Sequence, residues 1–218
     1  MRIHLPLVGA LAGLGLAVTA GAKASARFGM GAAQAGDRLP GDELIPDATL
    51  QGDRGETIDA PVDAVWPWIM QIGQDRGGFY SWTAAENAIG CDVTDVRVLR
   101  PEWATREVGD LVMLAPDFGL RVAQSEPDFA LVLTSTGGAV PQEQQGPAMD
   151  FDFSWAFVLM GFGGQTFLHV RERYLPRTAA ARATCQAVLP VSAVMTRKML
   201  RTIKELAESG SVAAGGVL

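Results

Sequence analysis

The clearest periodic pattern in the chain lies near its C-terminal end. With a helical period, one side of a segment that starts at Pro190 is apolar and the opposite side is charged. Pro190 suits the first turn of a helix, and Ser209-Gly210 suits its end. The apolar side consists of Val191, Met195, Met199, Ile203 and Leu206. The pattern therefore predicts a long amphipathic helix with one face to bury.

The second clear pattern is a hairpin of two strands, at 151–162 and 165–174, that turn at Gly163-Gly164. A two-residue turn places four pairs on one apolar face: Phe153 with Tyr174, Trp155 with Glu172, Phe157 with Val170 and Leu159 with Leu168. We expect this face to be buried. We expect the other face, which carries His169, Arg171 and Arg173, to lie toward water.

Shorter patterns complete the order of elements. Strands are predicted at 51–59, 111–115, 120–125 and 129–134, and short helices at 61–70 and 83–89. No strand–helix–strand alternation occurs, so a parallel sheet is not expected. The order predicts an α+β fold in which a curved antiparallel sheet wraps around the long C-terminal helix, with two short helices after the first strand.

A polar and aromatic stretch, residues 71–91, separates the two short helices. Gly77-Gly78 allows backbone angles that other residues avoid, so the stretch is predicted to be a shaped loop. Loops of this composition often form the rim of a pocket. We therefore expect Tyr80, Trp82 and Glu86 to project toward a cavity mouth. The alternative is a connector whose polar groups satisfy one another.

The N-terminal part of the chain differs in composition from the rest. Residues 5–22 carry no charge, and Arg2 and Lys23 flank them. A spanning helix takes about 20 apolar residues, so this run is predicted to be a single membrane anchor, with a cleaved secretory signal and export as the alternative. The predicted organisation is: 1–24 membrane segment or signal, 25–50 linker, 51–210 folded domain, 211–218 disordered tail.

Composition excludes several classes of function. The formal net charge is −6, which argues against a nucleic-acid partner, because phosphates require a basic surface. Two cysteines and two histidines form no zinc spacing, and no dinucleotide, P-loop or nucleophile-elbow motif is present. We therefore expect no metal, cofactor or defined catalytic set. Cys91 and Cys185 are either two buried thiols or a disulfide.

Several segments resemble one protein superfamily. Thr57-Ile-Asp-Ala-Pro-Val-Asp-Ala-Val-Trp66 resembles the opening signature of the START-like, Bet v-like helix-grip superfamily, also labelled SRPBCC. Residues 39–46, 71–91 and 195–200 resemble an uncharacterised bacterial branch of it. The resemblance covers roughly residues 39–208. It implies a curved sheet that grips the C-terminal helix around an apolar cavity. Members bind or carry hydrophobic small molecules, and some are polyketide cyclases.

The resemblance and the patterns together predict a ligand site. Its expected residues are Arg76, Tyr80, Trp82, Glu86, Trp155, Phe157, Glu172, Met195 and Met199. The expected function is binding or carrying a hydrophobic small molecule, lipid- or polyketide-like, at or near a membrane. One alternative is a cyclase-like enzyme that uses Glu86 or Glu172, although the favoured role for Glu172 is an ion pair with an arginine or a position at a wet opening. Another is a membrane-tethered interaction module whose cavity is filled by its own side chains.

The first prediction concerns residues 5–22. We expect the chain to associate with membranes through this segment without being cleaved, because the segment is uncharged and bounded by basic residues. Fractionation of the host cell, followed by intact mass measurement, tests this. A soluble product that lacks about the first 24 residues would instead identify a signal peptide.

Overall fold

A seven-stranded sheet forms the centre of the protein. The computed structural model describes residues 27–31, 34–116, 118–136 and 150–215. The sheet order is β1-β2-β7-β6-β5-β4-β3, and neighbouring strands are antiparallel except for β1, which runs parallel to β2. The strands are β1 (Arg27–Phe28), β2 (Leu50–Ile58), β3 (Leu111–Ala115), β4 (Phe118–Glu126), β5 (Ala130–Thr134), β6 (Phe151–Phe162) and β7 (Gln165–Pro176).

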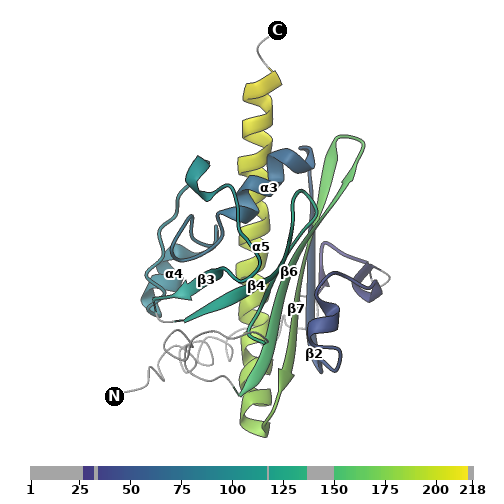
Figure 1. The fold of residues 1–218 in the computed structure, drawn as a ribbon, viewed down its shortest axis with the longest axis vertical. Coiled ribbons are helices and arrows are strands. Elements are labelled where there is room, and N and C mark those ends of the chain that lie inside the picture. The colour runs from purple at the N-terminus through teal and green to yellow at the C-terminus, as the bar shows by residue number, and fades with distance from the viewer. Residues whose placement is uncertain (1–26, 32–33, 117, 137–149, 216–218) are drawn as a thin grey trace.

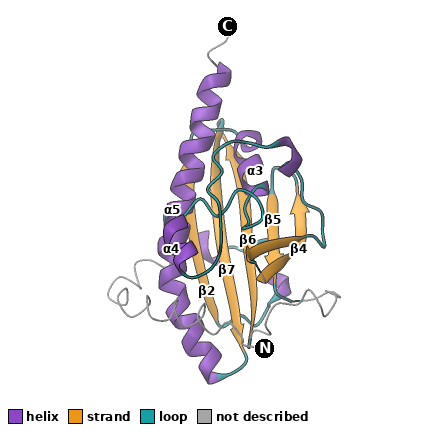
Figure 2. Cartoon of the chain, turned by 90° about the vertical axis from the view of Figure 1, so that its left-hand side faces the viewer, coloured by secondary structure: helices purple, strands orange, loops and turns teal. Residues whose placement is uncertain are grey.

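One long helix packs along one face of this sheet. The α-helices are α3 (Val62–Met70), α4 (Thr83–Ala88) and α5 (Ala179–Gly215), with short 3-10 turns at Gln34–Gly36 (η1), Asp42–Leu44 (η2) and Pro101–Trp103 (η3). α5 runs along the sheet and extends past it at the C-terminal end (Figures 1 and 2). It contacts β2, β7 and α3. The predicted helix-grip arrangement, with two short helices after the strand β2, is confirmed.

The predicted start and end of the last helix are wrong. α5 begins at Ala179, not at Pro190, and it continues past Gly210 to Gly215. Thr178 caps the true start, because its Oγ1 accepts a hydrogen bond from the Ala181 N–H at 3.1 Å. The added segments are rich in alanine, which favours helix, and Pro190 is accommodated inside the helix. The predicted apolar side is nevertheless correct, since Met199 and Ile203 are buried in the main core.

The predicted register of the hairpin is confirmed. Phe153 pairs with Tyr174 and Trp155 pairs with Glu172 across β6 and β7. Phe153, Trp155 and Tyr174 belong to the main core between the sheet and α5. The expectation for the opposite face is wrong, because His169 and Arg171 are 1% and 2% exposed. The charged side chains on this outer face are therefore covered.

Residues 34–46, here called the cover segment, lie over the outer face. Leu39 packs into a second small core with Ala130, Val132, Ala156 and Val158 of β5 and β6. Gly41 has a φ of 89°, and a Cβ at this position would lie 2.5 Å from Val132 Cγ1. Only glycine fits so close an approach in a left-handed conformation. This part of the predicted linker is thus packed on the folded domain.

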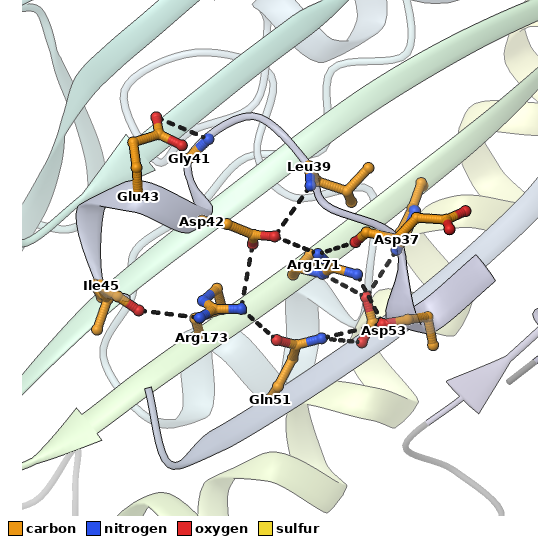
Figure 3. A network of polar contacts seen from close by, with 12 residues as sticks. Asp37, Leu39, Gly41, Asp42, Glu43, Ile45, Gln51, Asp53, Arg171 and Arg173 are labelled. Atoms are coloured by element: carbon orange, nitrogen blue, oxygen red, sulfur yellow. Dashed lines mark hydrogen bonds and ion pairs between the residues drawn. The ribbon is translucent and has the colours of Figure 1, made fainter. Parts of the chain in front are cut away.

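A buried network of charges fixes the cover segment to the sheet (Figure 3). Asp53 Oδ1 lies 2.7 Å from Arg171 Nε and 2.8 Å from His169 Nε2. Arg171 Nη1 reaches Asp42 Oδ2 at 2.7 Å, and Arg171 Nη2 donates to the Ala35 carbonyl at 2.9 Å. Burial raises the pKa of Asp53, but hydrogen bonds from His169, Gln51 and Arg171 outweigh it and hold that pKa below its ordinary value of 3.8.

The membrane prediction falls outside this description. Residues 5–22 are not among the described residues, so the anchor and its cleaved alternative both stay predictions. In the part of the chain that the structure does describe, no helix has the length and apolar character needed to cross a bilayer.

The second prediction corrects the expectation that Arg171 is a surface residue. Arg171→Ala should lower the free energy of unfolding by about 3–5 kcal/mol, because Asp53 loses its arginine partner and Asp42 is left with the longer contact to Arg173 Nη1, at 3.3 Å. Arg97→Ala is the matched control: Arg97 is half exposed and pairs with nearby Asp95, so its loss should cost about 0–1 kcal/mol. Denaturant titration measures both variants, and equal costs would contradict the proposed role of the network.

Candidate functional site

A cavity lies in the core between α5, the sheet and the α4 region. Its volume is about 260 Å³, and its wall is mainly apolar. The lining residues are Phe79, Ser81, Glu86, Ile89, Cys91, Leu114, Phe118, Phe151, Phe153, Trp155, Glu172, Tyr174, Thr184, Val188, Val191, Ser192, Met195, Thr196 and Met199. The sheet and α5 provide most of this wall, so the cavity is a space between their packed surfaces that is partly open to solvent.

Aromatic rings form one side of the cavity. β6 presents Phe151, Phe153 and Trp155 at alternate positions, as a strand with one buried face must. The ring centroids of Phe153 and of Tyr174 on β7 are 4.7 Å apart, and those of Phe79 and Trp155 are 6.5 Å apart. These contacts fix the rings, and they leave an apolar wall that suits a hydrophobic molecule.

The first polar group in the wall is the carboxylate of Glu172. Its Oε2 forms a buried ion pair with Arg54 Nη1 at 2.8 Å and accepts a hydrogen bond from the Tyr174 hydroxyl at 3.2 Å. The Ser192 hydroxyl of α5 donates to Oε1. Burial raises the pKa of Tyr174 well above its ordinary value, and the neighbouring Glu172 charge adds to this effect. Glu172 therefore has partners for both of its oxygens, and it links β2, β7 and α5.

The second polar group is Glu86 of α4, and it has a different environment. Glu86 is only 1% exposed. Neither of its carboxylate oxygens has a hydrogen-bond partner of ordinary geometry among the described residues. Burial raises the pKa of Glu86; the Ser81 hydroxyl lowers it, and the negative charge of Asp95 raises it further. The Trp155 Nε1–H on the same wall also has no described partner. The Glu86 carboxyl group and the Trp155 indole N–H are therefore two polar groups of the wall that a ligand could satisfy.

The cavity contains five of the nine residues predicted to bind ligand. Glu86, Trp155, Glu172, Met195 and Met199 line it. Arg76, Tyr80, Trp82 and Phe157 are not among its lining residues. Trp82 instead lies at the surface, 52% exposed, and Phe157 is buried in the core beside Trp155 at 4.7 Å. The expectation that Tyr80 and Trp82 project toward the cavity is therefore wrong.

The loop between α3 and α4 is mainly a connector with satisfied polar groups. Tyr80 is 1% exposed, packs edge-on against Trp68 and accepts a hydrogen bond from Gln71 Nε2 at 3.2 Å. Burial raises the pKa of Tyr80 to about 12. Arg76 Nη1 donates to the carbonyls of Met70, Trp103 and Thr105 at 3.0–3.2 Å. Phe79 and Ser81 are the parts of this loop that reach the cavity.

Arg54 and Ser192 are site residues that the sequence patterns did not reveal. Arg54 lies on β2, and its importance depends on the pairing of β2 with β7, which brings it near Glu172. A signal existed in the expectation that Glu172 pairs with an arginine, but sequence alone did not select which one. Ser192 lies three positions before Met195 on the cavity side of α5, and this spacing could have identified it.

Neither thiol nor metal chemistry is indicated by the described part of the chain. Cys91 and Cys185 are free and buried, and burial raises the pKa of each thiol to about 11. No group of three or more His, Cys, Asp or Glu side chains among the described residues lies close enough together to hold a metal ion. Cys91 contributes to the cavity wall as a small neutral side chain.

Comparison with known proteins gives structural matches only. No protein-family model and no curated protein matches the chain. The Zhui aromatase/cyclase from a Streptomyces species matches 77% of this chain and 99% of its own, at 17% identity and a TM-score of 0.44. CV1439 from Chromobacterium violaceum matches 72% and 96%, at 12% identity and 0.42. The Polyketide_cyc-like protein Cgl2372 from Corynebacterium glutamicum matches 75% and 93%, at 13% identity and 0.36. At such low identity no function is carried over.

The third prediction contrasts the two carboxylates of the cavity. Glu172→Gln should lower the free energy of unfolding by about 3–5 kcal/mol, because it leaves Arg54 buried without its partner. Glu86→Gln should not destabilise the protein at neutral pH. The folded-state pKa of Glu86 lies above its ordinary 4.5, so the wild type loses stability as the pH rises from below 4.5 through the folded-state value.

Thermal and denaturant unfolding of both variants, measured from acid to neutral pH, provide the test. The stability of Glu86→Gln relative to the wild type should increase as the pH rises. If Glu86→Gln were instead as destabilising as Glu172→Gln, Glu86 would have a structural partner, and the assignment of an unsatisfied carboxyl group would be wrong.

Proposed function

We propose that this protein binds a hydrophobic small molecule in the cavity between α5 and the sheet. The observation that carries the proposal is the cavity itself: a space of about 260 Å³ inside the main core, lined mainly by aromatic and aliphatic side chains. The cavity is partly open to solvent, so a small molecule can enter it, and its apolar wall is typical of small-molecule sites. Its volume is near the lower end of the range of small-molecule sites, roughly 300–1,000 Å³.

The wall also has features that suit a bound molecule. Met195 and Met199 are flexible and polarizable, so they can adjust to the shape of a lipid- or polyketide-like ligand. Glu86 and Trp155 add two polar groups that could orient it. A role as a carrier at or near a membrane is a further part of the proposal, and it depends on residues 5–22.

A cyclase-like enzyme is the second candidate function, and Glu86 is the observation that favours it. A buried carboxyl group with a raised pKa can remain protonated and donate a proton to a substrate as a general acid. Glu172 is less suited to this role, because Arg54 and two hydroxyl groups already hold its carboxylate.

The fourth prediction tests whether the cavity is the binding site. Val188 lines the cavity, whereas Val194, on the same helix, is 44% exposed and does not line it. Val188→Trp should fill the space and weaken binding of N-phenylnaphthylamine, a neutral apolar fluorophore, by about tenfold or more, while Val194→Trp should bind as the wild type does. Fluorescence titration measures both, with melting temperatures recorded alongside.

Two further outcomes distinguish the candidate functions. Native mass spectrometry of protein purified from its host should show a bound apolar molecule if the protein is a binder or carrier. Turnover of a polyketone by the wild type, lost in Glu86→Gln, would favour the enzyme. No bound molecule, and equal fluorophore binding by both tryptophan variants, would overturn the proposal and favour an interaction module.

A further inference from the structure

The charged groups in the cavity wall are unbalanced. Among the described residues that line the cavity there are two carboxylates, Glu86 and Glu172, and no lysine, arginine or histidine. Glu172 is balanced from behind the wall by Arg54, at 2.8 Å. After this pairing, Glu86 is the one acidic group of the described wall without a cation beside it. A suitable ligand must therefore provide a partner for the Glu86 carboxyl group.

Among the described residues, no cation acts on the Glu86 carboxyl group. The groups that act on its carboxyl are the Ser81 hydroxyl and the carboxylate of Asp95. The Cys91 thiol beside it has a pKa of about 11 and is neutral. The described residues of α5 and the sheet that line the cavity include no lysine, arginine or histidine. A buried carboxylate is stable only when it is paired or protonated, so Glu86 has a place for a positive partner that the protein does not itself supply.

The remaining wall is favourable for a cation as well. Phe79, Phe153, Trp155 and Tyr174 line the same cavity, and the face of an aromatic ring attracts a positive charge. The Asp95 charge increases the negative potential at Glu86. The whole chain carries a net charge of −6, which favours the approach of cations.

We propose that the ligand of this cavity is a hydrophobic amine whose ammonium group pairs with Glu86 and whose apolar body lies against the aromatic rings and methionines. The inference rests on the proposed function, because it names the class of molecule bound in the same cavity. Binding places a charge-assisted hydrogen bond in a low-dielectric site, where such bonds are strong. It also gives a cationic partner to the one carboxylate of the described wall that no arginine or lysine pairs with.

The fifth prediction uses three probes with one carbon skeleton: 4-phenylbutan-2-amine, 4-phenylbutan-2-ol (here phenylbutanol) and benzylacetone, which carry an amine, a hydroxyl and a ketone on the same carbon. Their dissociation constants are measured by calorimetry with the full chain at neutral pH. The amine should bind the wild type roughly tenfold to a hundredfold more tightly than either neutral probe. Glu86→Gln should remove this preference, so that the amine and the alcohol bind the variant with similar affinity.

The pH dependence gives an independent measure. The amine stays protonated below about pH 10, as a lysine does, so only Glu86 titrates in the range of interest. Amine affinity should be full above the free-protein pKa of Glu86 and should fall as the pH drops through it, while phenylbutanol affinity should not change. Asp95→Asn removes the repulsion that raises this pKa, so it should move the fall in affinity to lower pH.

Controls separate failure of this inference from failure of the proposed function. Glu205→Gln removes one carboxylate from the exposed side of α5, and it should bind all three probes as the wild type does. If N-phenylnaphthylamine binds in the cavity but the amine has no advantage, the cavity function stands and the amine inference is overturned. A preference for benzylacetone that needs Glu86 would overturn it in favour of a carbonyl ligand. Failure of the fluorophore to bind would overturn the proposed function itself.

Discussion

The packing of α5 against one face of the sheet is the interaction on which the rest of the molecule depends. α5 contributes Met199, Leu200 and Ile203 to the main core, and the sheet contributes the alternate residues of β6 and β7. Burial of this apolar surface is the main favourable contribution to folding. The two surfaces do not close completely along their length, and the cavity is the space that remains between them. The same contact therefore stabilises the fold and forms the site.

The alternation of side chains along β2 and β7 gives each face of the sheet its own ion pairs. Asp53 and Arg171 are directly paired and point to the outer face, where Asp42 joins them. Arg54 and Glu172 are their neighbours in sequence and point to the α5 face. β2 thus supplies the acid of the outer pair and the base of the inner pair, and β7 supplies the opposite charge to each. A shift of this pairing by one residue would turn the two charges of the shifted strand to the wrong faces and break both ion pairs, so the buried pairs also specify the pairing of these strands.

The sequence predicted features set by local rules and missed those set by distant contacts. The hairpin register followed from Gly163-Gly164 and the alternating pattern beside it, and the structure confirms it. The exposure of Arg171 could not be predicted in this way, because the residues that bury it lie in the cover segment, far away in sequence. Pro190 was interpreted as a helix start because the local signal is the same for a proline inside a helix. Glu86 was selected as a site residue from its polar surroundings, but its lack of a partner is decided by the three-dimensional fold.

The attachment of the cover segment has a consequence for the order of folding. Asp42 and Arg171 are 129 positions apart in the chain, and β7 is the last strand to be synthesised. The cover segment therefore cannot complete its ion pairs with the sheet until β7 has been synthesised. Contacts between such distant residues slow folding, since a long loop must close before they form. Until then, the carboxylates of Asp42 and Asp53 lack Arg171, although Leu39 can already pack against β5 and β6. The nascent chain therefore depends on β7 to neutralise these two acids.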